Sequence, residues 1–558
     1  MNPAAASNNP SPASAAAAGA AADAPGTYRV GTLTYTRFGL LSVFFWMLWG
    51  DLCVNIMETI IPRIVPLQLA RAGALATTIG LVTASVPAGV ELIVNPFVST
   101  YSDRYRSRFG RRRPFILFCT PILALFLLAI GFTDIVAPRI HAALGGLGMT
   151  PQTMTIVMLG VLLAIFQFFN VVVLATYYYL IADVVPPQVI GKFTSLYKVV
   201  GALGGVIFNK FIFKYADQYQ WQIYFGCAAV YVFAFMLMGW RVKEGEYPPP
   251  ERLSADGGAM SAAGQWLRES FAIRFYQKLY LIGLFYWAAF GAFIFQQMYA
   301  LNDLGISKAA AGDAFAWAGL LTLPLFFVLG PLSDRLHPVR MVTLGMFLMG
   351  CCSLACFFFI DSAAMRPMWS AAWGGVRGQP WLAWMWTKVL GAAPSGAGPD
   401  TQTLRAWQFT LWTTIWTVGQ TLYYGAQISL LPRVLPREQY GQYCAANNTL
   451  CAVAKFGAPV LCGWLIVKLG HGYRINYLWS AGCCFAGVIA CLAVWSHWKR
   501  LGGDAGYVPP RLARTGGGAN VEVAPVADPA DMAVPGATAV EAGRPEALAP
   551  ATTSQRLD

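Results

Sequence analysis

Twelve apolar stretches, each about twenty residues or longer, follow one another along this 558-residue chain. A helix needs roughly 20 apolar residues to cross about 30 Å of hydrocarbon, so each stretch predicts one membrane-spanning helix. The expected helices are 38–65, 77–101, 114–133, 153–183, 190–214, 221–241, 276–300, 309–332, 340–360, 407–431, 441–468 and 475–498. The sequence therefore predicts an all-α membrane protein with twelve transmembrane helices.

The composition agrees with a chain that lies mostly in lipid. Hydrophobic residues make up 57% of the sequence and charged residues 12%, about half of what soluble domains carry. The formal charge of +13 is spread over loops between apolar stretches and does not follow one soluble face. We therefore expect the lipid bilayer as a partner and no nucleic acid.

Cysteine and histidine give no indication of a metal centre. The 12 cysteines contain no C-x-x-C pair, and adjacent pairs such as Cys351–Cys352 point in different directions on a helix. Small apolar packing residues are the better interpretation. The four histidines fall in expected loops or at helix ends. We expect no metal and no cofactor.

Basic residues collect in alternate loops, which predicts the orientation in the membrane. Lys and Arg resist translocation, so loops rich in them stay in the cytoplasm. The first 36 residues contain no basic segment followed by an apolar core, so no cleavable signal peptide is predicted. We expect both termini in the cytoplasm and a location in a bacterial inner membrane. The basic connections are 102–113, 241–274, 335–340, 433–437 and 499–500; the long 361–406 loop, on the other side, is the exception.

The two halves of the chain repeat one another. Ser102-Asp103-Arg104 follows the second expected helix, and Ser333-Asp334-Arg335 follows the eighth. Two six-helix repeats joined by a polar linker are typical of transporters that bind substrate between their halves. The expected parts are disordered cytoplasmic tails at 1–36 and 499–558, six-helix bundles at 37–242 and 276–498, and a cytoplasmic linker at 243–275.

Several polar side chains lie inside the apolar stretches. Charged groups are costly in hydrocarbon, so they usually face a protein interior or a water path. Asp51, Asn55 and Glu58 share one face of the first helix because they lie at i, i+4 and i+7. The same spacing pairs Glu91 with Asn95. Further polar residues within stretches include Tyr424, Gln427 and Lys455.

These residues also have structural interpretations. A single amide in a membrane helix often joins helices, as Gln167, Gln296 or Gln420 would do. Asp51 or Lys455 alone fits a structural ion pair. Three carboxylates against one lysine leave an excess to neutralise, which favours an ion-coupling role. A membrane enzyme or receptor would need a nucleophile–base pair or a metal set, and no such pattern is visible in the stretches.

An arginine-rich loop carries a family resemblance. The loop reads Ser102-Asp103-Arg104, then Arg106-Ser107-Arg108-Phe109-Gly110-Arg111-Arg112-Arg113-Pro114-Phe115. With it, residues 38–498 resemble the major facilitator superfamily, and more closely its glycoside–pentoside–hexuronide:cation symporters and their sucrose-transporter relatives. The resemblance implies the major facilitator fold and sugar transport by alternating access.

The resemblance also assigns roles to individual residues. It implies a cation-coupling site at Glu91, Asn95 and Lys455, and a sugar-binding aspartate at Asp51. We expect Asn55, Glu58, Tyr424 and Gln427 to contact substrate as well. A conformational clamp on the cytoplasmic side would use Asp103, Arg104, Arg111, Asp334 and Arg335.

Asn95 stands where relatives have a second acidic cation ligand. Losing a charged ligand weakens a sodium site more than a proton site, so H⁺ is favoured over Na⁺. We expect a monomeric, proton-coupled symporter of a glycoside, with a di- or oligosaccharide as substrate. Sodium coupling, or a facilitator or exporter of another small solute, is the alternative.

Overall fold

The computed structural model describes residues 28–30, 32–144, 148–186, 189–245, 269–360, 379–380, 401–436, 440–514 and 520–523. Over these residues the protein is helical apart from two short strand pairs, β1 (Tyr28–Val30) with β2 (Leu33–Tyr35) and β3 (Arg511–Arg514) with β4 (Asn520–Val523). Ten helical segments within them are long and apolar enough to cross a membrane. The helices α12 and α16, of 28 and 34 residues, complete the expected set of twelve in the described part of the chain.

The first half of the chain forms six of these spans. They are α2 (Arg37–Arg71); α3 (Ala76–Gly80), η1 (Leu81–Ser85) and α4 (Val86–Arg104) as one span; α5 (Arg113–Ala143); α6 (Pro151–Val184); α7 (Ile190–Ile207) with η3 (Phe208–Ile212) and η4 (Phe213–Tyr215); and α8 (Gln220–Arg241).

The second half repeats the pattern. Its spans are α10 (Arg274–Gly291) with α11 (Phe293–Met298) and η5 (Tyr299–Asp303); α12 (Lys308–Arg335); α13 (Pro338–Phe359); α16 (Thr401–Val434); α17 (Tyr440–Leu469); and α18 (Ile475–Arg500). The short segments η7 (Gly472–Arg474) and α19 (Gly503–Gly506) flank α18.

Helix packing confirms the internal repeat that the sequence predicts. In the first half α5 packs on α6 and α8, and in the second half α13 packs on α16 and α18. The contacts of α2 with α7 and α8 recur as those of α10 with α17 and α18. Equivalent helices also pack across the interface between the halves: α7 packs against α12, and α17 packs against α3 and α4. The twelve-helix, two-repeat fold is therefore confirmed.

Helix starts follow local sequence signals. Thr36, Thr150 and Ser307 each accept a backbone N–H of the first turn through the side-chain hydroxyl, which satisfies one of the groups that a helix leaves unpaired. Prolines stand at the first turns of α5, α6 and α13, where a missing N–H costs nothing. The spans thus begin within a few residues of their expected positions.

The expected tails need correction where the structure describes them. Tyr28–Val30 and Leu33–Tyr35 form the β1–β2 pair inside the segment expected to be disordered. After α18 the chain continues in ordered contact, because the Tyr507 hydroxyl donates to the Val434 carbonyl at 2.6 Å and the Tyr276 hydroxyl donates to the Pro510 carbonyl at 3.1 Å. These bonds tie the segment to the second half. Most of the linker and most of both tails lie outside the described residues, so their boundaries stay predictions.

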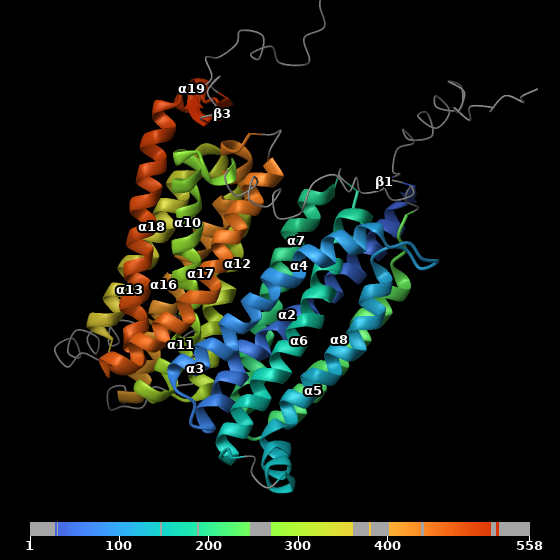
Figure 1. Ribbon diagram of the computed structural model, residues 1–558, viewed down its shortest axis with the longest axis vertical. Helices are drawn as coiled ribbons and strands as arrows, with labels where there is room; N and C mark the ends of the chain where they lie inside the picture. Colours follow the sequence, from blue (N-terminus) through green and yellow to red (C-terminus); the bar gives the residue numbers. More distant parts are fainter. Residues whose placement is uncertain are drawn as a thin grey trace, which may run out of the picture.

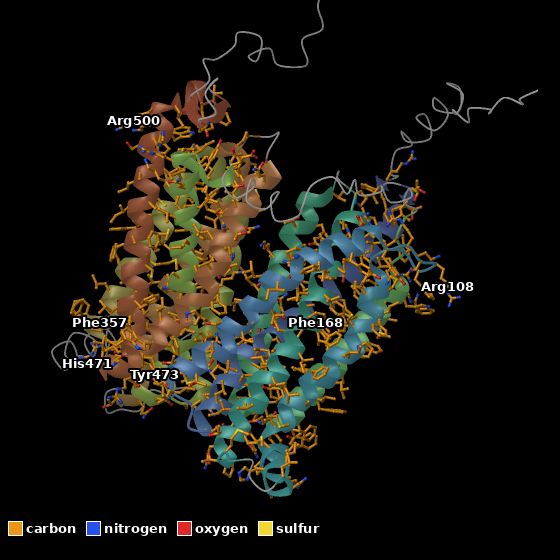
Figure 2. The ribbon with its side chains drawn as sticks, viewed as in Figure 1. Arg108, Phe168, Phe357, His471, Tyr473 and Arg500 are labelled. Atoms are coloured by element: carbon orange, nitrogen blue, oxygen red, sulfur yellow. The ribbon has the colours of Figure 1, made fainter. Side chains whose placement is uncertain are left out.

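The two halves meet at one end of the molecule. We call the end with the arginine-rich loop 105–112 and the start of α2 the loop side, and the end with the turns 72–75, 216–219 and 304–307 the far side. Figure 1 shows the halves apart near β1, α19 and β3, and together near α3 and α11. In Figure 2, Arg500 lies at the first of these ends and His471 and Tyr473 at the other. Both ends of the described chain lie on the loop side.

Candidate functional site

Two neighbouring cavities lie between the halves. The inner cavity has a volume of about 490 Å³, and the outer cavity, toward the loop side, about 680 Å³. Asn55, Glu58, Thr59, Pro62, Arg63, Thr83, Ala84, Pro87, Ala88, Glu91, Asn209, Trp287, Phe290, Gly291, Phe293, Ile294 and Lys455 line the inner cavity. Glu91, Leu92, Asn95, Pro96, Tyr179, Trp287, Gln427, Cys444, Ala445, Asn448, Thr449, Cys451, Ala452 and Lys455 line the outer cavity.

One ion pair separates the two cavities. Glu91 from α4 and Lys455 from α17 line both, and the Lys455 Nζ lies 3.6 Å from a Glu91 carboxylate oxygen. The ammonium also lies 4.2 Å from the centroid of the Trp287 ring, a third residue shared by both walls. Since α4 belongs to the first half and α17 to the second, this pair joins the halves at the middle of the site.

The first helix contributes only part of its expected polar face. Asn55 and Glu58 line the inner cavity, and Glu58 accepts a hydrogen bond from the Asn170 amide of α6 at 2.6 Å. Asp51 is fully buried and lines neither cavity. One of its oxygens accepts from Asn55 Nδ2 at 3.1 Å, and the other has no hydrogen-bond partner among the described residues. The structure therefore places Asp51 one turn beyond the site.

The second half shows a similar division. Gln427 of α16 lines the outer cavity, as does Asn95 of α4. Tyr424, one turn before Gln427, lines neither cavity and packs its ring edge-on against Tyr286 and Trp287. Tyr424 therefore contacts Trp287, which lines the cavities, without lining them itself. Helical spacing cannot separate these two neighbours, because it places both on the same face of α16.

The expected clamp is only partly described. Arg111 makes a two-bond contact with Asp183 of α6, at 2.6 and 3.2 Å, within its own half. Its backbone N–H donates to Glu244, as do those of Arg112 and Arg113. The side chains of Asp103, Arg104, Asp334 and Arg335 lie outside the described residues, although α4 and α12 end at Arg104 and Arg335.

Sequence reasoning overlooked Arg63. Its side chain is 7% exposed and lines the inner cavity, where the guanidinium lies 3.5 Å from the centroid of Phe315 and donates to Gln297 at 3.1 Å. A charge inside an apolar stretch indicates a functional residue. The prolines at positions 62 and 66, however, also fit a helix end near Arg63, where a charge is ordinary. The aromatic wall of Trp287, Phe290 and Phe293 was overlooked as well.

Two π-helical segments shape the inner cavity. Thr83 lies in η1 and Asn209 in η3, and both line the cavity wall. An inserted residue of this kind changes which side chains face inward, and such segments are frequent at functional sites. The periodicity of 3.6 residues that supports the helix prediction cannot locate them.

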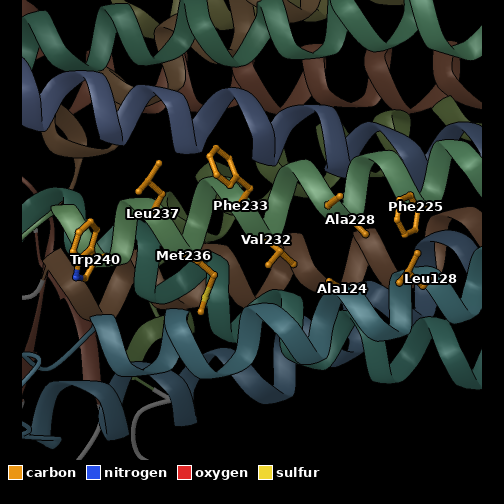
Figure 3. A pocket seen from close by; sticks show the side chains of 10 residues that line it. Ala124, Leu128, Phe225, Ala228, Val232, Phe233, Met236, Leu237 and Trp240 are labelled. Atoms are coloured by element: carbon orange, nitrogen blue, oxygen red, sulfur yellow. The ribbon is translucent and has the colours of Figure 1, made fainter.

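A third hollow, of about 650 Å³, lies on the outer face of the first half between α5 and α8 (Figure 3). Its walls are Ala124, Leu128, Phe225, Ala228, Ala229, Val232, Phe233, Met236, Leu237 and Trp240. The Trp240 indole is the one hydrogen-bonding side chain among these ten residues. A surface of this chemistry suits lipid chains, and it is separate from the site between the halves.

The interface site combines ionisable groups, amides and aromatic faces. Such a site can hold the hydroxyl groups of a small polar solute and move a proton at Glu91. Within the described residues no group of three or more His, Cys, Asp or Glu side chains is arranged to hold a metal ion.

Comparison with known proteins agrees with this architecture. Residues 31–459 match the model of the Major Facilitator Superfamily. The nucleoside transporter NupG superposes with a TM-score of 0.54 at 10% identity, covering 81% of this chain and 99% of that one. A D-xylose-proton symporter gives 0.53 at 14% identity over 82% and 97% of the two chains. A POT family transporter in complex with 5-aminolevulinic acid gives 0.53 at 11% identity over 84% and 97%.

No curated protein sequence matches this chain. The family match covers well over half of it, and the chain belongs to the Major Facilitator Superfamily. It is a multi-pass membrane protein of a transporter family, and transporters of this family bind small molecules within the membrane.

Proposed function

We propose that this transporter is a proton-coupled symporter of a glycoside, a di- or oligosaccharide, within the glycoside–pentoside–hexuronide:cation and sucrose-transporter-like branch. The observation that carries the proposal is the Glu91–Lys455 pair, because it joins the halves and lines both cavities. A proton on Glu91 removes the attraction to Lys455, so proton loading and the relative position of the halves are linked.

The lining of the two cavities supports a sugar as substrate. Amide and carboxylate groups accept and donate hydrogen bonds to hydroxyls, and buried polar partners make such sites selective. Asn55 and Glu58 provide them in the inner cavity, and Asn95 and Gln427 in the outer one. Trp287 and Phe290 add apolar ring faces of the kind that cover a sugar ring. Asp51 acts behind Asn55, through their hydrogen bond, and does not contact substrate.

A proton suits the site better than a sodium ion. Hard cations need several oxygen ligands at short distances, and the Lys455 ammonium already occupies the space beside the Glu91 carboxylate. Asn95 offers a neutral amide where a second carboxylate would strengthen a cation site. Glu91 alone is sufficient for a proton.

We further propose that the loop side faces the cytoplasm of a bacterial cell, at the inner membrane, with both termini inside and the chain acting as a monomer. The arginine-rich loop supports this orientation because basic loops remain in the cytoplasm. The structure then represents the inward-facing state. Asp103, Arg104 and Arg111 with Asp334 and Arg335 close the cytoplasmic side in the opposite, outward-facing state.

The test uses the full-length protein in proteoliposomes that contain a pH-sensitive dye. A panel of glycosides is added outside, and both proton influx and glycoside uptake are recorded. We expect one class of glycoside to drive proton influx, Glu91→Gln to abolish it, and downhill glycoside exchange to continue in that variant. The matched control is Asp134→Asn, which changes a carboxylate at the far end of α5.

Two outcomes contradict the proposal. Proton influx that persists in Glu91→Gln rules out Glu91 as the coupling group. Uptake that follows a sodium gradient, or equilibrates without any ion, identifies the sodium-coupled symporter or the facilitator instead.

A further inference from the structure

The charges that line the inner cavity balance in number. Two carboxylates, Glu58 and Glu91, face two cations, Arg63 and Lys455. The outer cavity adds no further charged side chain among its described lining residues. Lys455 has Glu91 at 3.6 Å, whereas Arg63 has no carboxylate of the described residues within 4.0 Å. The cavity therefore holds one cation that is paired and one that is not.

Glu58 does not serve as the partner of Arg63. Both lie on α2, five residues apart, and Glu58 accepts from Asn170 of α6. Arg63 instead points toward the second half of the molecule, with its guanidinium over Phe315 of α12 and near Phe293 of α11. Its one side-chain hydrogen-bond partner within the described residues is the Gln297 amide oxygen at 3.1 Å.

This environment favours a negative group on the ligand. The Phe315 ring covers the face of the guanidinium, so its N–H groups remain for contacts at the edge, where a carboxylate can bind in a two-bond geometry. A buried cation without a counterion is costly in a membrane, and a bound anion lowers that cost. We infer that Arg63 is a specificity-determining residue that binds a single negative charge on the substrate, so that the protein carries a monoanionic glycoside together with one proton.

The inference rests on the proposed proton symport and explains how coupling would arise. With both carboxylates ionised and no substrate, the lining of the inner cavity is neutral. A proton on Glu91 alone leaves one net positive charge, and the anion alone leaves one net negative charge. Proton and monoanion together restore neutrality. Because a net charge is costly in the low-dielectric middle of the membrane, the empty and fully loaded forms exchange between states more readily than the half-loaded forms.

The test compares neutral disaccharides with their carboxylate forms on the same proteoliposomes. Lactose is paired with lactobionate and cellobiose with cellobionate, and proton influx and charge movement are recorded separately. We expect the acid of at least one pair to bind about 10-fold more tightly than the neutral sugar, since hydrogen bonds to charged groups are stronger. Binding is read from the change in tryptophan fluorescence that is lost in Trp287→Phe, since this ring lines both cavities. Proton influx with the acid should be electroneutral and unchanged by an imposed membrane potential.

Variants separate charge recognition from contact between the halves. Arg63→Met should reduce the preference for the acid to about 1, and Arg63→Lys should keep part of it. Gln297→Leu removes both hydrogen bonds between Gln297 and Arg63 but leaves the cation, so the preference should remain. Arg71→Gln, on the same helix but paired with Asp134, is the matched control.

The outcomes distinguish a failure of the anion site from a failure of the proposed proton symport. Proton influx driven by a neutral sugar, with a net current and with the acids inactive, overturns the anion site and leaves proton symport standing. A preference for the acid that survives in Arg63→Met also overturns it. Absence of proton movement with every sugar and every acid overturns the proposed symport and, with it, the charge balance built on it.

Discussion

The two ends of the interface between the halves are held in different ways. On the far side, ion pairs cross between the halves: Lys210 lies 2.7 Å from Asp313, and Lys308 pairs with Asp217. On the loop side, by contrast, the contacts named above each stay within one half: Arg111 binds Asp183 in the first, and Tyr507 donates to the Val434 carbonyl in the second.

This difference shows which contacts must change during transport. Opening the far side requires the ion pairs between halves to break. On the loop side, the arginine-rich loop already forms a fixed surface in the open state. Glu244 fixes that surface, because its carboxylate accepts the backbone N–H groups of Arg111, Arg112 and Arg113 at the start of α5. The far side is therefore the changeable end and the loop the preformed end.

The largest expected effect comes from separating the halves on the far side. A side chain at Gly80 would bring a Cβ within 2.5 Å of the Pro459 carbonyl oxygen, so Gly80→Leu prevents closure. We expect uptake to fall at least about 100-fold, a barrier change of a few kcal/mol. In inside-out vesicles, labelling of Cys444 by an impermeant maleimide should fall as well, since Cys444 lines the outer cavity.

Gly457→Ala is the control for this substitution. Gly457 lies on α17 close to the same contact, and an added Cβ there meets nothing within 4 Å. Normal uptake in Gly80→Leu would show that the far side need not close as it does in the structure.

A smaller effect is expected at the preformed end. Glu244→Gln removes the negative charge that caps α5, and we expect a loss of about 1–2 kcal/mol in stability, read as a lower melting temperature of the purified protein. The comparison variant is Glu269→Gln, which changes a carboxylate on the same side that accepts a 3.5 Å bond from Gln442. An unchanged melting temperature would mean that the loop does not depend on this cap.

The ion pairs between halves should have still smaller effects. Lys210→Ala removes the partly buried pair with Asp313, and we expect a shift of about 1 kcal/mol toward the far-side-open state. Reduced Cys444 labelling from the loop side reports the shift. The exchange of Lys210→Asp with Asp313→Lys should restore labelling; if it does not, the pair has no role as a latch.

The smallest effect is expected for Lys308→Ala. Its partner Asp217 has 59% of its side chain exposed, compared with 15% for Asp313, and solvent weakens the pair accordingly. We expect at most about 0.5 kcal/mol, measured by the same labelling. A larger shift than that of Lys210→Ala would reverse the ranking by burial.

Most of the fold could be predicted from sequence because each span is marked by a long apolar stretch. The expected helix 190–214 corresponds to α7, η3 and η4 over 190–215, and 221–241 to α8 over 220–241. The third helix ends ten residues beyond its expected end, since α5 continues through Pro138 to Ala143. A polar helix end outside the hydrocarbon leaves no mark in an apolar pattern.

The site could be predicted only in part. Helical spacing correctly groups Asn55 with Glu58, and Glu91 with Asn95, on walls of the cavities. It also groups Asp51 with them, although α7 covers that turn of α2: a Cβ on Gly201 would lie 3.0 Å from the Asp51 carboxylate. The spacing within one helix carries no information about which neighbour covers each turn. The pairing of Arg63 with Gln297, 234 residues away, is beyond any local pattern.

The far-side contact has a consequence for how fast the halves can part. Interfaces of interlocking side chains have preferred positions, because each ridge must leave its groove before the helices can shift. Here main chain approaches main chain: a Cβ on Gly463 would lie 2.7 Å from the Ala76 carbonyl oxygen, and one on Gly312 would overlap the Asn209 carbonyl. At these glycines the helices can shift relative to each other without any side chain leaving a groove. The frequency of opening is then governed by how often the flanking ion pairs dissociate.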